Sequence, residues 1–270
     1  NGAIRIEDAH PFINRCNIRD NAYSGVCLWN LSGNLKISNS LIKNNTGSGI
    51  NISYSLGTTT VSNCTISNNT GAGVFIFEGI ITISNSSIIN NSATNGGGGI
   101  HLEGYMYGNI TSSATISNSM ISGNSVIGNG GGIYVYAPNT KSAIMTLSNS
   151  KITNNTSSGK GGGIYACGAW GVVNNPPGTV TISIFGSAIS GNTASSDGGG
   201  IFALGDTKVF KTSGQAYLSI SESFISNNSS SGNGGGIFYS SAWNYSGEAT
   251  ITSNIIGCNY ASGSGGGILP

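Results

Sequence analysis

Charged residues are scarce in this chain: they make up 7% of its 270 residues, with ten basic and nine acidic side chains and a formal net charge of +1. The basic residues stand singly, so no cluster is present that would bind nucleic acid through its phosphates or hold the chain to an anionic membrane surface. No apolar run approaches the roughly 18 residues that a membrane-spanning helix needs. The sequence therefore argues against nucleic-acid binding and against membrane insertion within this segment.

Cysteine is also rare, with five residues. An odd number, no Cys-x-x-Cys pair and irregular spacings match neither a zinc site nor a dense disulfide framework. We interpret these residues as small side chains within a repeat, and we expect no metal site and no cofactor. The cysteines are Cys16, Cys27, Cys64, Cys167 and Cys258.

Glycine, by contrast, contributes 44 residues, and Asn, Ser and Thr are abundant. Such a composition is typical of disordered linkers, but a disordered tract has no reason to keep the regular Ile and Val spacing seen here. Six near-copies of one glycine run lead into an isoleucine, in residues 95–103, 128–136, 159–167, 196–204, 232–240 and 263–270. A phosphate-binding loop is needed once and precedes a helix, so this repetition indicates architecture rather than catalysis.

One asparagine anchors each of nine repeats. An isoleucine stands three residues before every anchor, and Ile, Val or Leu stands eight residues before it. A glycine-led aliphatic residue follows five residues after the anchor in the first three repeats and nine after it in the last six. Alternation at period two predicts half-buried strands, and no segment has a helical period. The anchors are Asn21, Asn45, Asn69, Asn91, Asn124, Asn155, Asn192, Asn228 and Asn259.

Three short strands per turn predict one coil of a parallel β-solenoid. Equal positions of successive coils then stack about 4.8 Å apart, so the aliphatic columns form one core. We expect the Asn column to form a ladder in which each side chain turns inward and satisfies backbone groups at a corner. We expect the glycines at the corner between the second and third strands, where stacked turns leave little room for side chains. The fold class predicted is all-β, one domain over residues 1–270, about nine coils with variable insertions on one side.

Residues 224–227 read Phe-x-x-Asn, and Gly-Gly-Gly-Ile occurs at 130–133, 161–164, 198–201, 234–237 and 265–268. This pairing resembles the polymorphic outer-membrane-protein repeats of autotransporter adhesins, although a third glycine replaces their alanine and most repeats lack the Phe. The resemblance covers about residues 80–268 well and the first three turns more loosely. It implies a right-handed parallel β-helix, secreted or surface-displayed and often adhesive. No catalytic residues are carried over, because those repeats have none.

The same superfamily includes polysaccharide lyases and glycoside hydrolases, so a carbohydrate-active enzyme is the alternative. Glycoside hydrolysis needs two carboxylates about 5 to 9.5 Å apart. Only Glu78 and Glu103 fall at comparable places in adjacent coils, with His101 nearby and no basic residue expected beside them. We interpret all three as solvated turn residues and predict no catalytic residue. An ice-binding solenoid would need a flat, regular Thr array, and no such column is expected.

Aromatic residues gather on one predicted face, because in six repeats a ring follows the glycine-led aliphatic residue directly and is expected to point outward. Three interpretations stay open: the rings stack on sugars, form a protein interface, or lie beneath the insertions. The contact candidates, including rings further along these strands and in the insertions, are Phe75, His101, Tyr134, Tyr165, Phe202, Phe238, Tyr136, Trp170 and Trp243.

Five Asn-x-Ser/Thr sequons directly precede an anchor and should face outward, which makes them candidate glycosylation sites in a secreted chain. A chain rich in Asn, Ser and Thr also generates sequons by chance. The candidates are Asn44, Asn68, Asn90, Asn154 and Asn227.

Neither end of the chain resembles a capping element, so we expect a segment of a longer rod or a subunit that stacks axially. Taken together, the sequence predicts a non-enzymatic rod, structural or adhesive, that is extracellular or on the cell surface. Its expected partners are further copies of itself or a cell-surface glycan or protein.

Overall fold

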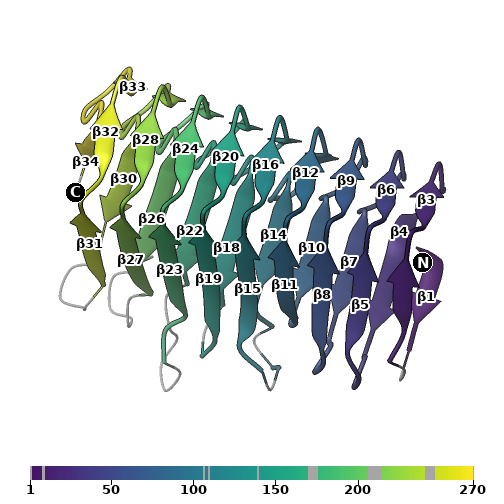
Figure 1. Cartoon of the computed structure of the whole chain (residues 1–270). Helices are drawn as coiled ribbons and strands as arrows, with labels where there is room; N and C mark the ends of the chain where they lie inside the picture. The colour runs from purple at the N-terminus through teal and green to yellow at the C-terminus, as the bar shows by residue number, and fades with distance from the viewer. Residues whose placement is uncertain are drawn as a thin grey trace.

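The computed structural model describes residues 2–7, 10–105, 107–108, 110–138, 140–169, 176–205, 214–240 and 247–269. Within them every regular element is a β-strand, and neighbouring strands are parallel. The chain winds into a solenoid with its termini at opposite ends (Figure 1). The predicted parallel β-solenoid is therefore confirmed. No helix that could cross a bilayer occurs in the part of the chain that the structure describes.

Two of the four sheets contain the longer strands. Sheet A holds the strand that follows the glycine run in each coil: β1 (Gly2–Ile6), β4 (Ser24–Trp29), β7 (Ile50–Ser53), β10 (Val74–Phe77), β14 (Ile100–Glu103), β18 (Ile133–Ala137), β22 (Ile164–Gly168), β26 (Ile201–Gly205), β30 (Ile237–Ser240) and β34 (Ile268–Leu269). Sheet B holds the next strand of each coil: β2 (Phe12–Asn14), β5 (Leu35–Ser38), β8 (Thr58–Ser62), β11 (Ile80–Ser84), β15 (Ser112–Ser117), β19 (Ser142–Ser148), β23 (Thr179–Phe185), β27 (Gln215–Ser221) and β31 (Glu248–Thr252).

The other two sheets contain short strands. Sheet C consists of three-residue strands: β3 (Asn17–Arg19), β6 (Leu41–Lys43), β9 (Thr65–Ser67), β12 (Ser87–Ile89), β16 (Met120–Ser122), β20 (Lys151–Thr153), β24 (Ala188–Ser190), β28 (Phe224–Ser226) and β32 (Ile255–Gly257). Sheet D consists of two-residue strands: β13 (Ser92–Ala93), β17 (Ser125–Val126), β21 (Thr156–Ser157), β25 (Thr193–Ala194), β29 (Ser229–Ser230) and β33 (Tyr260–Ala261).

Sheet D corrects the expectation of three strands in every coil. The later coils have four additional residues between the anchor and the glycine-led aliphatic residue, and these residues include a short strand with one inward side chain. Ala93, Val126 and Ala194 are the buried side chains of three such strands. The extra length therefore adds a fourth side to the coil.

The apolar core consists of columns of identical or similar side chains. Ile88 of β12 pairs with Ile66 of β9 and Ile121 of β16, and all three are completely buried. Full burial of such a side chain contributes about 1.5–3 kcal/mol. The core extends along the solenoid because every coil supplies the same inward positions.

The segments that join sheet A to sheet B run along one edge of the solenoid (Figure 1). Their lengths differ: residues 78–79 connect β10 to β11, whereas residues 104–111 connect β14 to β15. The predicted insertions of variable length on one side are therefore confirmed.

Corners are formed by columns of left-handed backbone. The residue before each anchor and the residue six before it have positive φ, as at Asn44 (55°) and Asn39 (50°). Asn tolerates this conformation better than most residues, which explains its abundance. The glycine column has a different cause: a Cβ on Gly132 would lie 2.6 Å from the carbonyl oxygen of Gly163 in the next coil. Glycine is required there by close backbone approach, as the sequence predicts.

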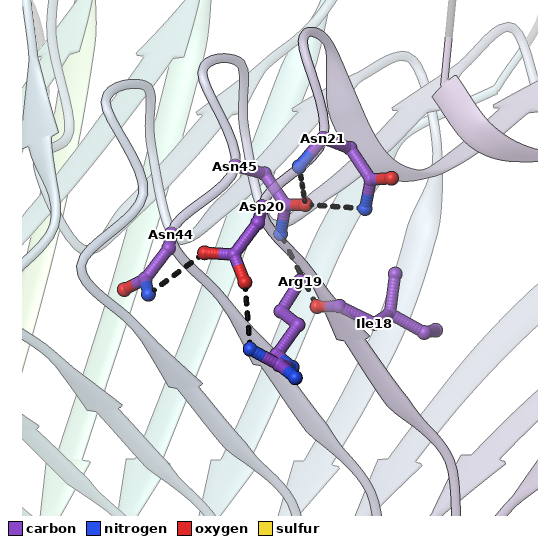
Figure 2. A network of polar contacts seen from close by, with 6 residues as sticks. All are labelled: Ile18, Arg19, Asp20, Asn21, Asn44 and Asn45. Carbon is purple, nitrogen blue, oxygen red and sulfur yellow. Dashed lines mark hydrogen bonds and ion pairs between the residues drawn. The ribbon is translucent and has the colours of Figure 1, made fainter.

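The predicted Asn ladder is confirmed. Asn45 Nδ2 donates to Asn69 Oδ1 at 2.9 Å, and the backbone N–H of Asn45 donates to the same oxygen at 3.0 Å. Figure 2 shows the start of the ladder, where Asn21 donates to Asn45 and where Asn45 also donates to the carbonyl of Ile18. Each buried amide thus bridges neighbouring coils and satisfies a carbonyl of the corner. Outside the ladder, Asp20 accepts from Asn44 of the next coil (Figure 2).

Sheet B carries a hydroxyl column on its outer face that the sequence analysis did not identify. Thr60, Thr82, Thr115 and Thr146 pair in successive strands, and Ser183, Ser219 and Thr250 continue the column. The expectation that no regular Thr column exists was therefore wrong. Each of these residues stands nine positions before its anchor Asn, so the column lies at a fixed offset in the repeat.

Asn124→Ala tests the ladder. The change removes the acceptor of the Asn91 backbone and side-chain amides, and the donor to Asn155 and Ile88. We expect the free energy of unfolding to fall by about 3 kcal/mol, because each unsatisfied buried polar group costs about 1–3 kcal/mol. Denaturant unfolding measures it. The control Thr115→Ala, in the same coil but exposed, should change stability by less than about 0.5 kcal/mol. If the two variants lose equally little free energy of unfolding, the Asn ladder does not stabilise the fold as described.

Candidate functional site

Six rings stack in one column along sheet A. They occupy equal positions in strands β10 to β30, and their centroids are separated by 4.6 to 5.3 Å. Among the last four rings of the column, from Tyr134 to Phe238, the planes of consecutive rings differ by 8° or less. Stacked aromatic pairs contribute about 0.5–1.5 kcal/mol beyond the area they bury. The column is Phe75, His101, Tyr134, Tyr165, Phe202 and Phe238.

Glycine runs cover much of this column. The carbonyl oxygen of Gly96 lies 3.2 Å from His101 Nδ1, and a Cβ on Gly96 would lie 3.2 Å from the Tyr134 ring. His101 is 6% exposed and Phe202 is 1% exposed, so these two candidates present almost no surface to a partner. The column was expected to point outward. It does lie on the outer side of its strands, but the preceding glycine runs fold over it.

The remaining tyrosines of this column are half-buried. Burial raises the pKa of Tyr134 and Tyr165 far above the ordinary tyrosine value, so both rings stay neutral. Tyr136, two residues beyond Tyr134, is half-buried, and the centroids of the two rings are 6.1 Å apart. The other two contact candidates, Trp170 and Trp243, lie outside the described residues.

Lys160 and Asp197 form an ion pair that covers the column at Phe202. Lys160 Nζ lies 4.5 Å from the centroid of Phe202 and 3.3 Å from Asp197 Oδ2. Asp197 Oδ1 accepts from the backbone and side-chain amides of Asn233 at 3.0 and 3.2 Å. Burial raises the pKa of Asp197, but the bonds from Asn233 and the charge of Lys160 outweigh it and hold this pKa below the ordinary value. These contacts join three successive glycine runs to one another and to the ring column.

The three candidates of the enzyme alternative are held in structural contacts. Glu78 is buried, and its Oε1 accepts from the backbone N–H of Ile110 at 3.4 Å. Glu103 Oε2 lies 3.0 Å from His101 Nε2. The two ring nitrogens of His101 thus face the carbonyl oxygen of Gly96 and the carboxylate of Glu103. The expectation that these are solvated turn residues was wrong for Glu78 and His101, which are buried. In the described part of the chain, no three His, Cys, Asp or Glu residues are grouped to hold a metal ion.

A second group of rings lies at the edge where sheet A ends. Tyr54 is central to it, with centroid distances of 5.0 Å to Trp29, 5.4 Å to Phe77 and 5.2 Å to Tyr105. Tyr107 extends the group 5.7 Å beyond Tyr105. Trp29 is 48% exposed and Tyr107 is 77% exposed. We call these five residues the edge cluster. It offers more accessible aromatic surface than the stacked column does.

The five sequon asparagines are exposed, and each has a left-handed backbone with φ of 55° or 56°. The residue after each is a ladder Asn. Sequons therefore arise where the corner favours Asn and a Ser or Thr follows the ladder residue. Glycosylation at these residues stays a prediction.

The comparisons with known proteins agree with this geometry. Residues 1–116 match the family model described as right handed beta helix region. Residues 149–167, 186–204 and 222–240 match the Chlamydia polymorphic membrane protein repeat. The chain is a right-handed β-helix in which three segments match the polymorphic membrane protein repeat. Neither the search of curated proteins nor the search of solved structures gave a match.

Each matched polymorphic membrane protein repeat covers the same structural unit. The segment 149–167 starts at a left-handed corner, passes through the ladder residue Asn155 and the glycine run, and ends beyond the stacked ring of Tyr165. The motif therefore encodes corner, ladder and ring stack, and it relates this chain to a membrane- and surface-associated family. The edge cluster lies outside these three segments.

The five cysteines, all in the described part of the chain, form no disulfide, and Cys27, Cys64 and Cys167 are buried. Burial raises the pKa of Cys64, so this thiol stays protonated and unreactive. The interpretation as small side chains of the repeat holds for these three buried residues.

The edge cluster includes Trp29, Tyr54 and Tyr105, which the sequence analysis did not select. Their positions in the repeat differ, so no column reveals them. The one available signal was local: a Trp at the end of one strand and a Tyr at the end of the next, one residue later in register.

Asp197→Asn tests whether the ion pair between Lys160 and Asp197 stabilises the fold. A lowered folded-state pKa means that the carboxylate stabilises the fold above the ordinary value of 3.8 and loses this effect as pH falls through the lower folded value. At pH 7 we expect the variant to be less stable by up to about 1 kcal/mol, because the pair is partly exposed. The difference from wild type should begin to shrink as pH falls below 3.8, and it should disappear below the folded-state pKa. Thermal unfolding from pH 2 to 7 measures it, with Glu248→Gln as the exposed control. A constant difference at all pH values would contradict this assignment.

Proposed function

We propose that this chain is a non-enzymatic extracellular rod that makes adhesive contact at a cell surface through the insertion-bearing side of sheet A. The observation that carries the proposal is the edge cluster: exposed rings at the side from which the variable segments project, on a β-helix with surface-protein repeats. Exposed aromatic surface of this kind marks interaction sites. The stacked column serves as a structural part of the same sheet.

A rigid parallel β-helix suits a surface rod, because its ladders hold the contact side in one geometry along the axis. Low charge and outward Ser, Thr and Asn on the other sheets keep those faces hydrated. The partners proposed are a cell-surface glycan or protein, and further copies of the chain in lateral association. Exposed sequons are compatible with an extracellular location, as is the surface association of the repeat family.

The contact function is tested by coating beads with the purified chain and counting the cells that bind. We expect binding to fall at least fivefold when Trp29 and Tyr105 are both replaced by Ala. The matched control is Phe224→Ala, an aromatic residue that is 52% exposed on sheet C. Equal binding by all variants, or none by wild type across several cell types, would contradict the proposal.

The non-enzymatic part is tested with a panel of polysaccharides and an assay for reducing ends and unsaturated products. We expect no release by wild type, because Glu78 is buried beneath Gly108 of the next coil and accepts from the backbone amide of Ile110. Glu78→Gln and Glu103→Gln should give the same result as wild type. Release that disappears in either variant would establish the carbohydrate-active alternative.

A further inference from the structure

Three unusual features meet at the edge cluster: a bulky residue with left-handed backbone, a buried carboxylate, and a depression in the surface. Tyr54 has φ of 55° and Glu78, at the equivalent place one coil later, has φ of 56°. A left-handed conformation is costly for a residue other than Gly, Asn or Asp, so it is kept where the surroundings impose it. The backbone strain at Tyr54 and Glu78 therefore occurs in two successive coils, next to the accessible rings.

The backbone of Tyr54 places its ring between two others. Trp29, Ser53 and Phe77 occupy one register position in β4, β7 and β10. The small side chain of Ser53 leaves a space between the two large rings, and the Tyr54 ring lies edge-on to both, at interplanar angles of 69° and 84°. Edge-to-face packing is a favourable aromatic geometry. The cluster is therefore assembled before any ligand arrives.

Glu78 holds the segment that carries Tyr105. Its Oε1 accepts from the Ile110 backbone, and a Cβ on Gly108 would lie 2.1 Å from the same oxygen, so the segment passes directly over the carboxylate. Gly108 also donates its N–H to the Tyr105 carbonyl at 2.8 Å, and its own carbonyl accepts from Lys141 Nζ. These contacts keep Tyr105 against Tyr54 and Phe77. Glu78 is a positioning residue here.

The depression that results has a volume of about 370 Å³ and is lined by Trp29, Asn30, Tyr54 and Tyr105. No lining residue carries a charge at neutral pH. Burial, together with the nearby Tyr105 and Glu78, raises the pKa of Tyr54, which keeps its hydroxyl neutral. An anionic ligand would lose hydration without gaining a cationic partner among these four residues, whereas a neutral ligand with apolar and hydroxyl faces complements them.

We propose that this depression binds a pyranose ring of a neutral glycan, and the proposal rests on the contact function above. The C–H face of the sugar packs against the rings of Trp29 and Tyr105, and its hydroxyl groups bond the side-chain amide of Asn30 and the Tyr54 hydroxyl. Asn30 is exposed, with φ of 52°, beside Trp29. The site is shallow, so it takes one sugar of an oligosaccharide at a time and acts through many copies on a surface.

The test is titration calorimetry of the whole chain with neutral tetrasaccharides of glucose, galactose, mannose and N-acetylglucosamine in both linkages. Sialylated and sulfated tetrasaccharides are the charged comparison. We expect at least one neutral probe to bind, more tightly than any charged probe. Trp29→Ala and Tyr105→Ala should each weaken binding at least tenfold. Phe224→Ala should leave it unchanged.

Two further variants separate binding from folding. Tyr54→Asn places at this corner the residue that Asn30 provides one coil earlier, which relieves backbone strain but removes three ring contacts, so we expect a folded variant that has lost binding. Glu78→Ala should weaken binding by releasing the segment of Tyr105, whereas Glu78→Gln keeps an acceptor for Ile110 and should restore it. Binding retained by Tyr54→Asn would overturn the proposal.

Other outcomes also decide. Absence of binding to every neutral probe, or binding unaffected by Trp29→Ala, overturns the glycan site. If the variant with both Trp29→Ala and Tyr105→Ala loses cell binding while wild type binds no neutral glycan probe, the contact function stands and this site is wrong. Binding that protease treatment of the cells abolishes and glycosidase treatment does not would assign the edge cluster to a protein partner and overturn the proposal. Failure of both the cell and the glycan assays overturns the function and the site together.

Discussion

The stacking of equal positions in neighbouring coils is the constraint on which the rest of this structure depends. Parallel pairing without slippage brings Asn next to Asn, Ile next to Ile and ring next to ring. A shift by one residue would direct every inward side chain outward, so the register is strongly specified. The buried amides of the ladder add a second requirement, since each must meet the next to satisfy its hydrogen bonds. Together these two conditions explain why the repeat is strict at few positions and free elsewhere.

The same constraint gives the two aromatic groups different roles. Rings in the stacked column lie at a repeated position, so their neighbours are other rings and the glycine runs above them, and burial follows. Phe202 is the extreme case, enclosed between Tyr165, Phe238 and Lys160. The edge cluster lies where the coil leaves the repeat, and its residues keep part of their surface. Contact with a partner is therefore proposed for residues outside the repeat, on a frame that the repeat makes rigid.

Much of the fold could be predicted because register is visible in the sequence. The Asn anchors, the Ile three residues before them and the glycine column all lie at fixed offsets, and the structure places each where the offsets indicate. The fourth sheet could not be predicted in this way, since strands such as Ser92–Ala93 are two residues long and have no period of their own. The Thr column of sheet B stands nine residues before the anchors, so the same offsets could have predicted it.

The candidate site could be predicted only in part. The position of the ring column follows from the repeat, but its burial depends on glycine runs whose positive φ turns them back over His101 and Phe202. The left-handed backbone of Tyr54 has no signal in a Tyr residue, and the contact of Glu78 with the segment 104–110 joins residues about thirty positions apart. Both depend on packing between coils. Local sequence does not contain that information.

The central claim is that the edge cluster makes contact with the partner while the stacked column supports the fold. Hydroxyl-radical footprinting of the chain, free and bound to cells, tests it most directly. The account predicts that Trp29 and Tyr107 are oxidised in the free chain and protected in the bound chain, while Phe202 and His101 are unmodified in both. Protection at Phe75, Tyr134, Tyr165 and Phe238, with Trp29 unchanged, would contradict it and move the contact surface to the stacked column.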